Sequence, residues 1–320
     1  MKKSRVRIWG IGSKTQILKD RMMATKIPYV DEVWNLAVGC TKIAPGCLHC
    51  WGEDWHTKRH LAKRAGRKLP QQYARPFSEV QFLPERLEQP LHWRRPRDIF
   101  VCSQSDLFHV DISDEQIWRV LHTMAVALQH RYFIFTKRIE RAHELLNQFY
   151  RGIVKHKWSY NIWLMLSIST QNEADEKIPI LMDTNVVHRG LSIEPMLEEI
   201  DVSYKGLGII CPECKGKGYI TNRKHWMHPA NTGDGSAENW CLDCNNLSEV
   251  NPIIAGIEWV ICGCESGSKR RPFDPDWARA ILRQCERPEV PFWMKQMEIQ
   301  GRVRHAVKYF PEDLQIQEKP

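Results

Sequence analysis

The sequence of 320 residues contains no hydrophobic run long enough to cross a membrane. Its apolar stretches, such as residues 162–166, are far shorter than the roughly 20 residues that a membrane helix needs. Lys2 and Lys3 are not followed by an apolar segment, so a signal peptide is not expected. Internal repeats and low-complexity tracts are also missing, which excludes fibrous and repeat architectures. We therefore expect a cytoplasmic protein with no membrane partner.

The composition is that of an ordinary globular protein, with 42% hydrophobic and 26% charged residues. Lysine and arginine number 46 against 38 acidic residues, a surplus that is compatible with a polyanionic partner but does not establish one. The 13 tryptophans indicate large rings in the core or on stacking surfaces. In a reducing compartment, the 11 cysteines indicate metal binding or catalysis rather than disulfides.

Short apolar runs alternate with amphipathic helical patterns along most of the chain. Helices are expected from Ser113, where Gln116 completes a capping box, over residues 139–150, and from Asp274 with Pro275 in the first turn. The apolar runs predict buried parallel strands, and no G-x-G-x-x-G motif follows the first of them, so a complete or partial (β/α) barrel is favoured over a Rossmann sheet. The expected strands cover residues 34–39, 98–103, 131–136, 161–168, 188–193, 257–262 and 290–295.

Residues 204–250 interrupt this alternation and are expected to form an inserted subdomain. The barrel would then comprise residues 1–203 and 251–300, followed by a C-terminal tail at 301–320. Two C-x-x-C motifs in the insert can surround one tetrahedral Zn²⁺, as in zinc ribbons, although their spacer is long and contains His225 and His228 as possible substitutes. A segment so poor in apolar residues needs a metal to fold, so we predict structural zinc there. The predicted ligands are Cys211, Cys214, Cys241 and Cys244.

A second cysteine group, Cys40, Cys47 and Cys50, directly follows the first expected strand. Three thiolates leave one iron of a [4Fe-4S] cluster without a protein ligand, and S-adenosylmethionine (SAM) is the partner that such an iron takes for radical generation. The alternative is a zinc ion with His56 or His49 as the fourth ligand. Three unligated thiols are the less favoured explanation. The cysteine spacing alone does not decide between an iron–sulfur cluster and a zinc ion.

Several sequence blocks, read together, resemble a phage and prophage family of radical-SAM-like proteins. The resemblance runs in order from about residue 30 to about residue 300. It implies a partial barrel of the radical-SAM type that carries the cluster on its three cysteines, and a three-cysteine-motif protein as a possible partner. The matching blocks are residues 34–47, 105–109, 136–138, 192–195, 265–272 and 292–296.

The sequence departs from the radical-SAM pattern in three places. The first cysteine gap holds six residues, where the standard motif is C-x3-C-x2-C, so loop contacts to SAM cannot be carried over. Trp51 stands where relatives usually have tyrosine, and its ring would pack against adenine. The run from Cys262 to Glu265 replaces the usual Gly-Gly-Glu.

The carboxyl ends of the strands form the mouth of such a barrel, where reactive residues lie. Hydroxyl and carboxylate groups there suit the amino and carboxylate groups of SAM, although each is also compatible with a helix cap or a satisfied core group. Besides Trp51, the candidates for cofactor binding are Ser103, Ser105, Asp106, Ser167, Ser169, Ser192, Glu194 and Glu265.

Positive side chains are expected at the same mouth, from Lys137, Arg138 and Lys295. They would bind a phosphate or a carboxylate, unless they form internal ion pairs with Glu194 or Glu265. Lys137, Lys295 and Glu194 are therefore also catalytic candidates. Cys264 is the fourth: its thiol would return a hydrogen atom to a product radical, whereas the alternative is a small packing residue.

Three basic runs, at residues 58–68, 92–97 and 269–271, contain aromatic neighbours or several arginines. Basic residues neutralise phosphates and rings stack on bases, so three such runs favour a nucleic acid or nucleotide substrate over a merely solvated surface.

The sequence thus predicts a radical SAM enzyme that forms a 5′-deoxyadenosyl radical and modifies or repairs a nucleic acid or nucleoside, with an external electron donor. One alternative is a non-catalytic, zinc-stabilised nucleic-acid-binding protein. Another is radical modification of a peptide or protein.

Overall fold

The computed structural model describes residues 25, 27–151, 160–203, 256–267, 269–286 and 288–320. The predicted zinc insert, with Cys211, Cys214, Cys241 and Cys244, lies outside these residues. In the described part of the chain, no helix combines the length and the apolar character that spanning a membrane requires.

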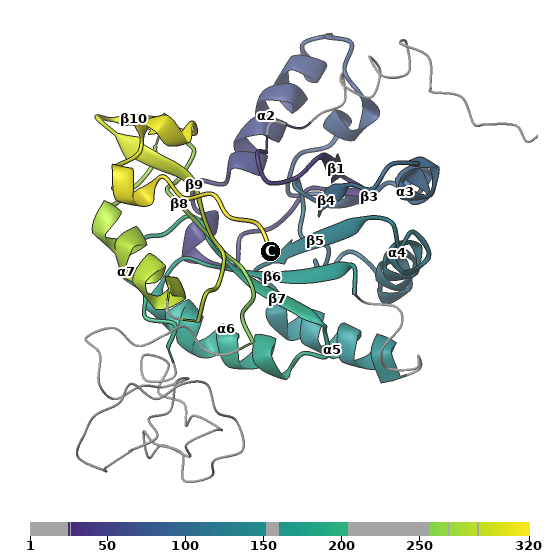
Figure 1. Ribbon diagram of the computed structural model, residues 1–320. Helices are drawn as coiled ribbons and strands as arrows, with labels where there is room; N and C mark the ends of the chain where they lie inside the picture. Colours follow the sequence, from purple (N-terminus) through teal and green to yellow (C-terminus); the bar gives the residue numbers. More distant parts are fainter. Residues whose placement is uncertain (1–24, 26, 152–159, 204–255, 268, 287) are drawn as a thin grey trace, which may run out of the picture.

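The centre of the molecule is a curled sheet of eight strands (Figure 1). All neighbours are parallel except the last pair, and the spatial order follows the chain. Sequential parallel strands joined by outer helices confirm the expected α/β class and the partial (β/α) barrel. The order is β1 (Glu32–Trp34), β4 (Asp98–Val101), β5 (Arg131–Thr136), β6 (Ile162–Ile168), β7 (His188–Ile193), β8 (Val260–Gly263), β9 (Phe292–Ile299) and β10 (Arg302–Arg304).

The expected first strand, residues 34–39, was wrong in its bounds. The chain leaves the main sheet after Trp34, and β2 (Ala37–Val38) pairs instead with β3 (Gln81–Phe82) in a separate antiparallel sheet. Arg86 fixes this departure, because its guanidinium donates to Asn35 O at 2.8 Å and its own carbonyl accepts from Trp34 Nε1 at 2.8 Å. An apolar run in the sequence gives no indication of these long-range hydrogen bonds.

Helices cover the outer face of the sheet (Figure 1). The capping box of Ser113 and Gln116 is confirmed at the start of α4, as are the helix from Ile139 and the helix with Pro275 in its first turn. The elements are α4 (Asp114–Val126), α5 (Ile139–Arg151), α6 (Gln171–Asp183) and α7 (Pro275–Glu286), with α2 (Trp51–Arg64), α3 (Gln89–His92) and the 3-10 helices η1 (Pro45–Cys47), η2 (Gln71–Ala74), η3 (Pro84–Arg86), η4 (Val307–Tyr309) and η5 (Glu312–Leu314) elsewhere.

The two faces of the sheet are packed differently, because alternate residues of a strand point to opposite faces. In β6, Leu164 and Leu166 join the aliphatic core below the helices, whereas Trp163 and Met165 join an aromatic core on the inner face. Every residue of β6 is buried, as expected for a parallel strand covered on both sides. The inward series continues to Ser167 at the end of the strand, and this alternation aims polar side chains into the mouth.

The segment at residues 301–320, expected as a C-terminal tail, packs along β9. After β10, Phe310 and Leu314 are buried in the core, and Met294 N donates to Ile316 O at 2.9 Å. The indole of Trp259 also donates to Glu318 O at 2.9 Å. The segment therefore covers the edge that β9 would otherwise expose.

Replacing Leu314 by alanine should lower the free energy of unfolding by about 3 kcal/mol, because a fully buried side chain leaves a cavity. Urea denaturation measures the change. Leu128→Ala is the matched control, since Leu128 is exposed and its loss should have little effect. Equal effects of the two substitutions would show that the C-terminal segment is not part of the core.

Candidate functional site

A cavity of about 170 Å³ lies at the carboxyl ends of β4, β5 and β6. The loop after β2 supplies Cys40 and Cys47 to its wall, and Cys50 immediately precedes α2. The structure thus brings the three cysteines together with six of the polar residues that were expected at the mouth. These six are Ser103, Ser105, Asp106, Lys137, Arg138 and Ser167.

Gly39 fixes the start of the cysteine loop. Its φ of +102° is one that side-chain-bearing residues rarely adopt, and an added Cβ would lie 2.7 Å from Glu79 O. The carbonyl of Gly39 accepts from Ser105 Oγ at 2.6 Å, and Cys40 N donates to Phe77 O at 2.9 Å. Ser105, a predicted cofactor ligand, therefore holds the loop that carries Cys40.

The turn around Cys47 is seated directly on the ends of β6 and β7. A Cβ on Gly46 would collide with Ser169 Oγ and lie 3.1 Å from Pro195 Cδ. From the other side, Arg271 donates to Pro45 O at 2.9 Å. The carboxylate of Glu265 accepts from the Arg271 backbone N–H at 2.6 Å and also pairs with its guanidinium. Glu265, another predicted cofactor ligand, acts through Arg271 to position the cysteine turn.

The three thiols are free and partly buried. Burial raises the pKa of Cys40 to about 11, with the nearby carboxylate of Asp106 adding to the effect, and burial likewise raises the pKa of Cys50. Such thiols become thiolates most readily when a bound metal stabilises the negative charge. Their chemistry therefore fits a metal centre that supplies positive charge within the cavity.

His56, the alternative zinc ligand, is directed elsewhere. Its ring packs against Tyr73 and Phe77, and Nε2–H donates to Arg75 O at 2.9 Å. Among the described residues, no three His, Cys, Asp or Glu side chains are close enough to hold a single metal ion. The cysteines instead surround a common cavity, which suits a larger group such as an iron–sulfur cluster.

Asp106 joins the loop after β4 to the end of β5. Its buried carboxylate accepts from Thr136 Oγ1 at 2.9 Å and from the backbone N–H groups of Lys137 and Phe108 at 3.0 Å. Four acceptor sites shared among these donors leave little capacity for a ligand. Asp106 therefore lines the cavity as predicted, but its carboxylate connects the loop after β4 to the end of β5.

Lys137 contributes a charged side chain to the cavity. Its Nζ is buried, and no hydrogen-bond partner for it occurs within the described ranges. Leaving a buried ammonium without a partner is costly, so this position favours an anionic ligand. The expected ion pair with Glu194 or Glu265 is not formed by this lysine.

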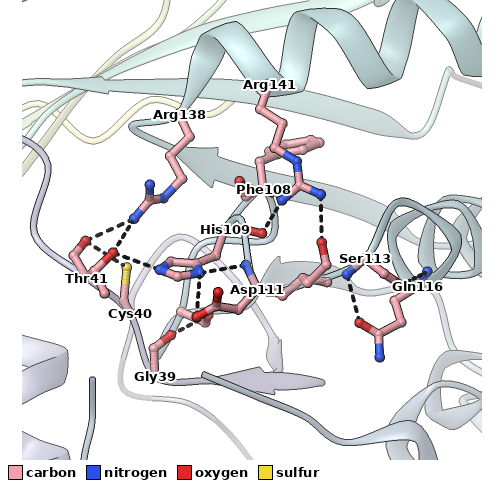
Figure 2. Close-up of polar contacts among 12 residues, drawn as sticks. Gly39, Cys40, Thr41, Phe108, His109, Asp111, Ser113, Gln116, Arg138 and Arg141 are labelled. Carbon is pink, nitrogen blue, oxygen red and sulfur yellow. Dashed lines mark hydrogen bonds and ion pairs between the residues drawn. The ribbon is translucent and has the colours of Figure 1, made fainter. Parts of the chain in front are cut away.

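Sequence reasoning did not select Thr41 and His109, which the structure places beside Cys40 (Figure 2). His109 Nδ1 accepts from Asp111 N–H at 3.1 Å, so Nε2 carries the hydrogen and donates to Thr41 Oγ1 at 2.8 Å. Arg138 donates to the same oxygen at 2.9 Å and to Thr41 O at 3.0 Å. Burial and the Arg138 charge lower the pKa of His109 and keep the ring neutral. The only sequence signal was that Thr41 and His109 lie within the matching blocks 34–47 and 105–109.

A second charged group, Glu194 with Lys295, lies outside the cavity lining. Lys295 Nζ is 2.6 and 2.7 Å from the two Glu194 oxygens and sits 5.8 Å from the ring centre of Tyr29. Burial alone would lower the pKa of Lys295, but the Glu194 carboxylate outweighs it and raises that pKa above its usual value. Burial also raises the pKa of Tyr29 to about 12. The expected alternative, an internal ion pair, is therefore present here.

Four of the remaining predicted residues, Ser169, Ser192, Cys264 and Trp51, are also outside the lining of the cavity. Ser169 and Ser192 are buried, and Ser192 is in register with Ser167 of the neighbouring strand. Cys264 is fully buried, and burial raises the pKa of its thiol to about 12, so it packs as a neutral group. Ser103 lines the cavity, but its hydroxyl donates to Asn35 Oδ1 at 3.2 Å. Trp51 is on the surface and stacks on Trp55.

A Gly46→Ala substitution should displace the turn that carries Cys47, because the new methyl group collides with Ser169. We expect the iron bound per chain after anaerobic reconstitution to fall by at least about half, since ligand geometry sets metal affinity. Gly267→Ala is the matched control, because a Cβ there has its nearest neighbour at 3.9 Å. Undiminished iron in the Gly46 variant would mean that the turn tolerates a shift.

A Glu194→Gln substitution should lower the free energy of unfolding at neutral pH by about 2 kcal/mol, because it leaves the Lys295 ammonium without its counter-charge. Chemical denaturation measures the loss. The double variant Glu194→Gln with Lys295→Met removes both charges and should recover part of it. No recovery in the double variant would show that the pair does not act as a unit.

Comparison with known proteins places the chain in a family. No curated protein sequence matches it. Among solved structures, a spore photoproduct lyase mutant with bound AdoMet and dinucleoside spore photoproduct is similar at 12% identity and a TM-score of 0.37; the match covers 59% of this chain and 57%, little more than half, of that one. Spore photoproduct lyase complexed with the dinucleoside has 11% identity and a TM-score of 0.39, covering 93% and 78%. A family model described as "Protein of unknown function (DUF5131)" matches residues 24–309. The chain therefore belongs to the DUF5131 family.

Proposed function

We propose that this protein is a radical SAM enzyme that acts on a nucleic acid or nucleotide. Cys40, Cys47 and Cys50 would hold a [4Fe-4S] cluster with one open iron for SAM. The observation that carries the proposal is the convergence of three free cysteines on one cavity at the mouth of a partial (β/α) barrel. A zinc ion on Cys211, Cys214, Cys241 and Cys244 and a three-cysteine-motif partner stay predictions beside it.

The cluster would supply one electron to SAM, so that cleavage of SAM gives a 5′-deoxyadenosyl radical that abstracts hydrogen from the substrate. An external electron donor has to provide that electron. The chain itself would bind and orient the ligands and would exclude water from the site.

Lys137 is the residue that we assign to anion binding in the cavity. Its Nζ is buried and has no hydrogen-bond partner among the described residues, which suits a carboxylate or phosphate oxygen. The backbone N–H of Lys137 is fixed by Asp106, which in turn holds Thr136, so the lysine starts from a defined position. By fixing the backbone of Lys137, Asp106 would help to orient an anion bound to the lysine.

Thr41 would orient a group beside Cys40. Its hydroxyl oxygen accepts from both His109 and Arg138, so its own hydrogen is directed away from these two donors. Because Thr41 and Cys40 both line the cavity, this hydrogen would be available to a ligand bound there. The neutral His109 ring and the Arg138 guanidinium together hold Thr41 in place.

Aromatic side chains would keep water out of the cavity. Phe77, Phe100 and Phe135 form part of its lining, and the rings of Phe100 and Phe135 are 4.3 Å apart. A dry lining strengthens the electrostatic interaction between Lys137 and an anion. It also protects a reactive radical from side reactions with solvent.

Anaerobic purification of the wild type is expected to give about four irons per chain beyond any zinc, and dithionite should then release 5′-deoxyadenosine from SAM. Cys47→Ala should lose both signals. Cys285→Ala is the matched control, because Cys285 is buried in α7 and does not line the cavity. A wild-type protein with zinc but neither iron nor SAM cleavage would refute the enzyme and leave the nucleic-acid-binding alternative.

A further inference from the structure

A column of stacked side chains runs along α2, directly after the third cysteine of the cavity. The rings of Trp51 and Trp55 are stacked with centroids 5.8 Å apart and an angle of 21° between their planes. The guanidinium carbon of Arg59 lies 3.2 Å from the centre of the Trp55 ring. We refer to Trp51, Trp55 and Arg59 as the α2 column.

The column is on the surface, although tryptophan rings are usually buried on at least one side. Trp51 is 46% exposed and Trp55 is 38% exposed. The opposite side of the helix makes the packing contacts: Gly52 and His56 are buried, and His56 packs on Tyr73 and Phe77. Since α2 is anchored through that other face, docking the helix does not require the two tryptophans.

Spacing of four residues places the members of the column one above the other. Trp55 has Trp51 and Arg59 as neighbours, whereas Trp51, at the end of the column, has a ring contact with Trp55 alone in the described part of the chain. With nearly half of its surface exposed, Trp51 offers a further flat surface for stacking.

The surroundings of the column are positively charged. Residues 51–68 contain six lysines and arginines but two acidic residues, and one of those, Glu53, is paired with Lys42 at 2.9 Å. Lys58, Arg64 and Arg67 are exposed. A stacking surface with fixed positive charge along one helix complements a polyanion that carries flat rings.

The column also begins next to the cavity. Trp51 begins α2 immediately after Cys50, which lines the cavity. In Figure 1, α2 extends away from the main sheet at the top of the view, so the helix leads outward from the site. A polymer bound along α2 would therefore have one part close to the three cysteines.

We propose that the α2 column binds single-stranded nucleic acid, with an unpaired base stacked on Trp51 and phosphates near the basic residues of α2. The inference rests on the proposed function, because it takes the nucleic acid substrate from there and specifies its form. Single strands are required because paired bases in a duplex have no free face for a ring. An acidic peptide would satisfy the charges but not the stacked rings.

The test measures binding of a dye-labelled, mixed-sequence oligonucleotide to the full chain by fluorescence anisotropy, as single-stranded DNA, as RNA of the same sequence and as a duplex. Trp51→Ala should weaken single-strand binding about tenfold, the loss expected for one stacked base, and should change duplex binding much less. Trp51→Phe keeps a ring and should retain part of the affinity. Arg59→Lys keeps the charge but loses the flat guanidinium, so it should also weaken binding.

Trp118→Ala is the matched control, because Trp118 is 40% exposed on α4 and belongs to a different surface. Its affinity for the oligonucleotides should equal that of the wild type. Single-strand binding that Trp51→Ala leaves unchanged, or that polyglutamate displaces as effectively as unlabelled oligonucleotide, would overturn the inference.

The same samples separate this inference from the proposed function. SAM cleavage by the wild type without any oligonucleotide reports on the cluster alone. If SAM is cleaved but the Trp51 variants bind like the wild type, the enzyme assignment stands and the α2 column is wrong. If SAM is not cleaved but Trp51→Ala loses single-strand binding, the column stands as a binding surface without radical chemistry.

Discussion

The close contact between the cysteine turn and the strand ends is the constraint on which the site depends. Gly46 has no room for a side chain above Ser169, and Arg271 ties the carbonyl of Pro45 to Glu265 at the end of β8. These contacts set where Cys47 lies relative to the barrel. The same turn leads to Cys50 and so decides where α2 begins. One tight approach between a loop and the sheet therefore positions both the cavity and the surface beside it.

A second set of bonds keeps the opposite wall in place. Asp106 connects the loop after β4 to the end of β5, and Arg138, one residue after Lys137, reaches back to Thr41 in the cysteine loop. Arg141, one turn further along α5, is bonded to carbonyls of the 108–112 segment (Figure 2). Three consecutive loops are thus tied to each other by charged hydrogen bonds, which are stronger than neutral ones. Such a wall can hold a ligand group at a fixed distance from Cys40.

Much of the fold could be predicted from the sequence, because buried parallel strands leave continuous apolar runs and the helices carry caps such as Ser113 with Gln116. The first strand failed because its end is decided by Arg86, 51 residues away from Asn35. A local pattern contains no information about such a partner.

The residues of the candidate site could likewise be predicted only where a local pattern selects them. The rule of strand ends selected Lys137 and Ser167 correctly as lining residues. It did not distinguish a free polar group from one already bonded, so it could not show that Asp106 and Glu265 hold loops. Trp51 looked like a ring for the cofactor because of its place in the motif, whereas the helical spacing to Trp55 and Arg59 directs it to the surface column. His109 was missed because its partner, Thr41, comes from a distant loop.

The order of the strands has a further consequence for access. β1 and β10 stand at opposite ends of the sheet, and in the described residues they do not pair, so the sheet is open rather than closed into a ring. A closed barrel admits a ligand only through its rim, whereas an open one also has a side. A long linear molecule can be laid across such a side at any point along its length. For the nucleic acid substrate proposed above, selection of an interior position would then require neither a free end nor threading.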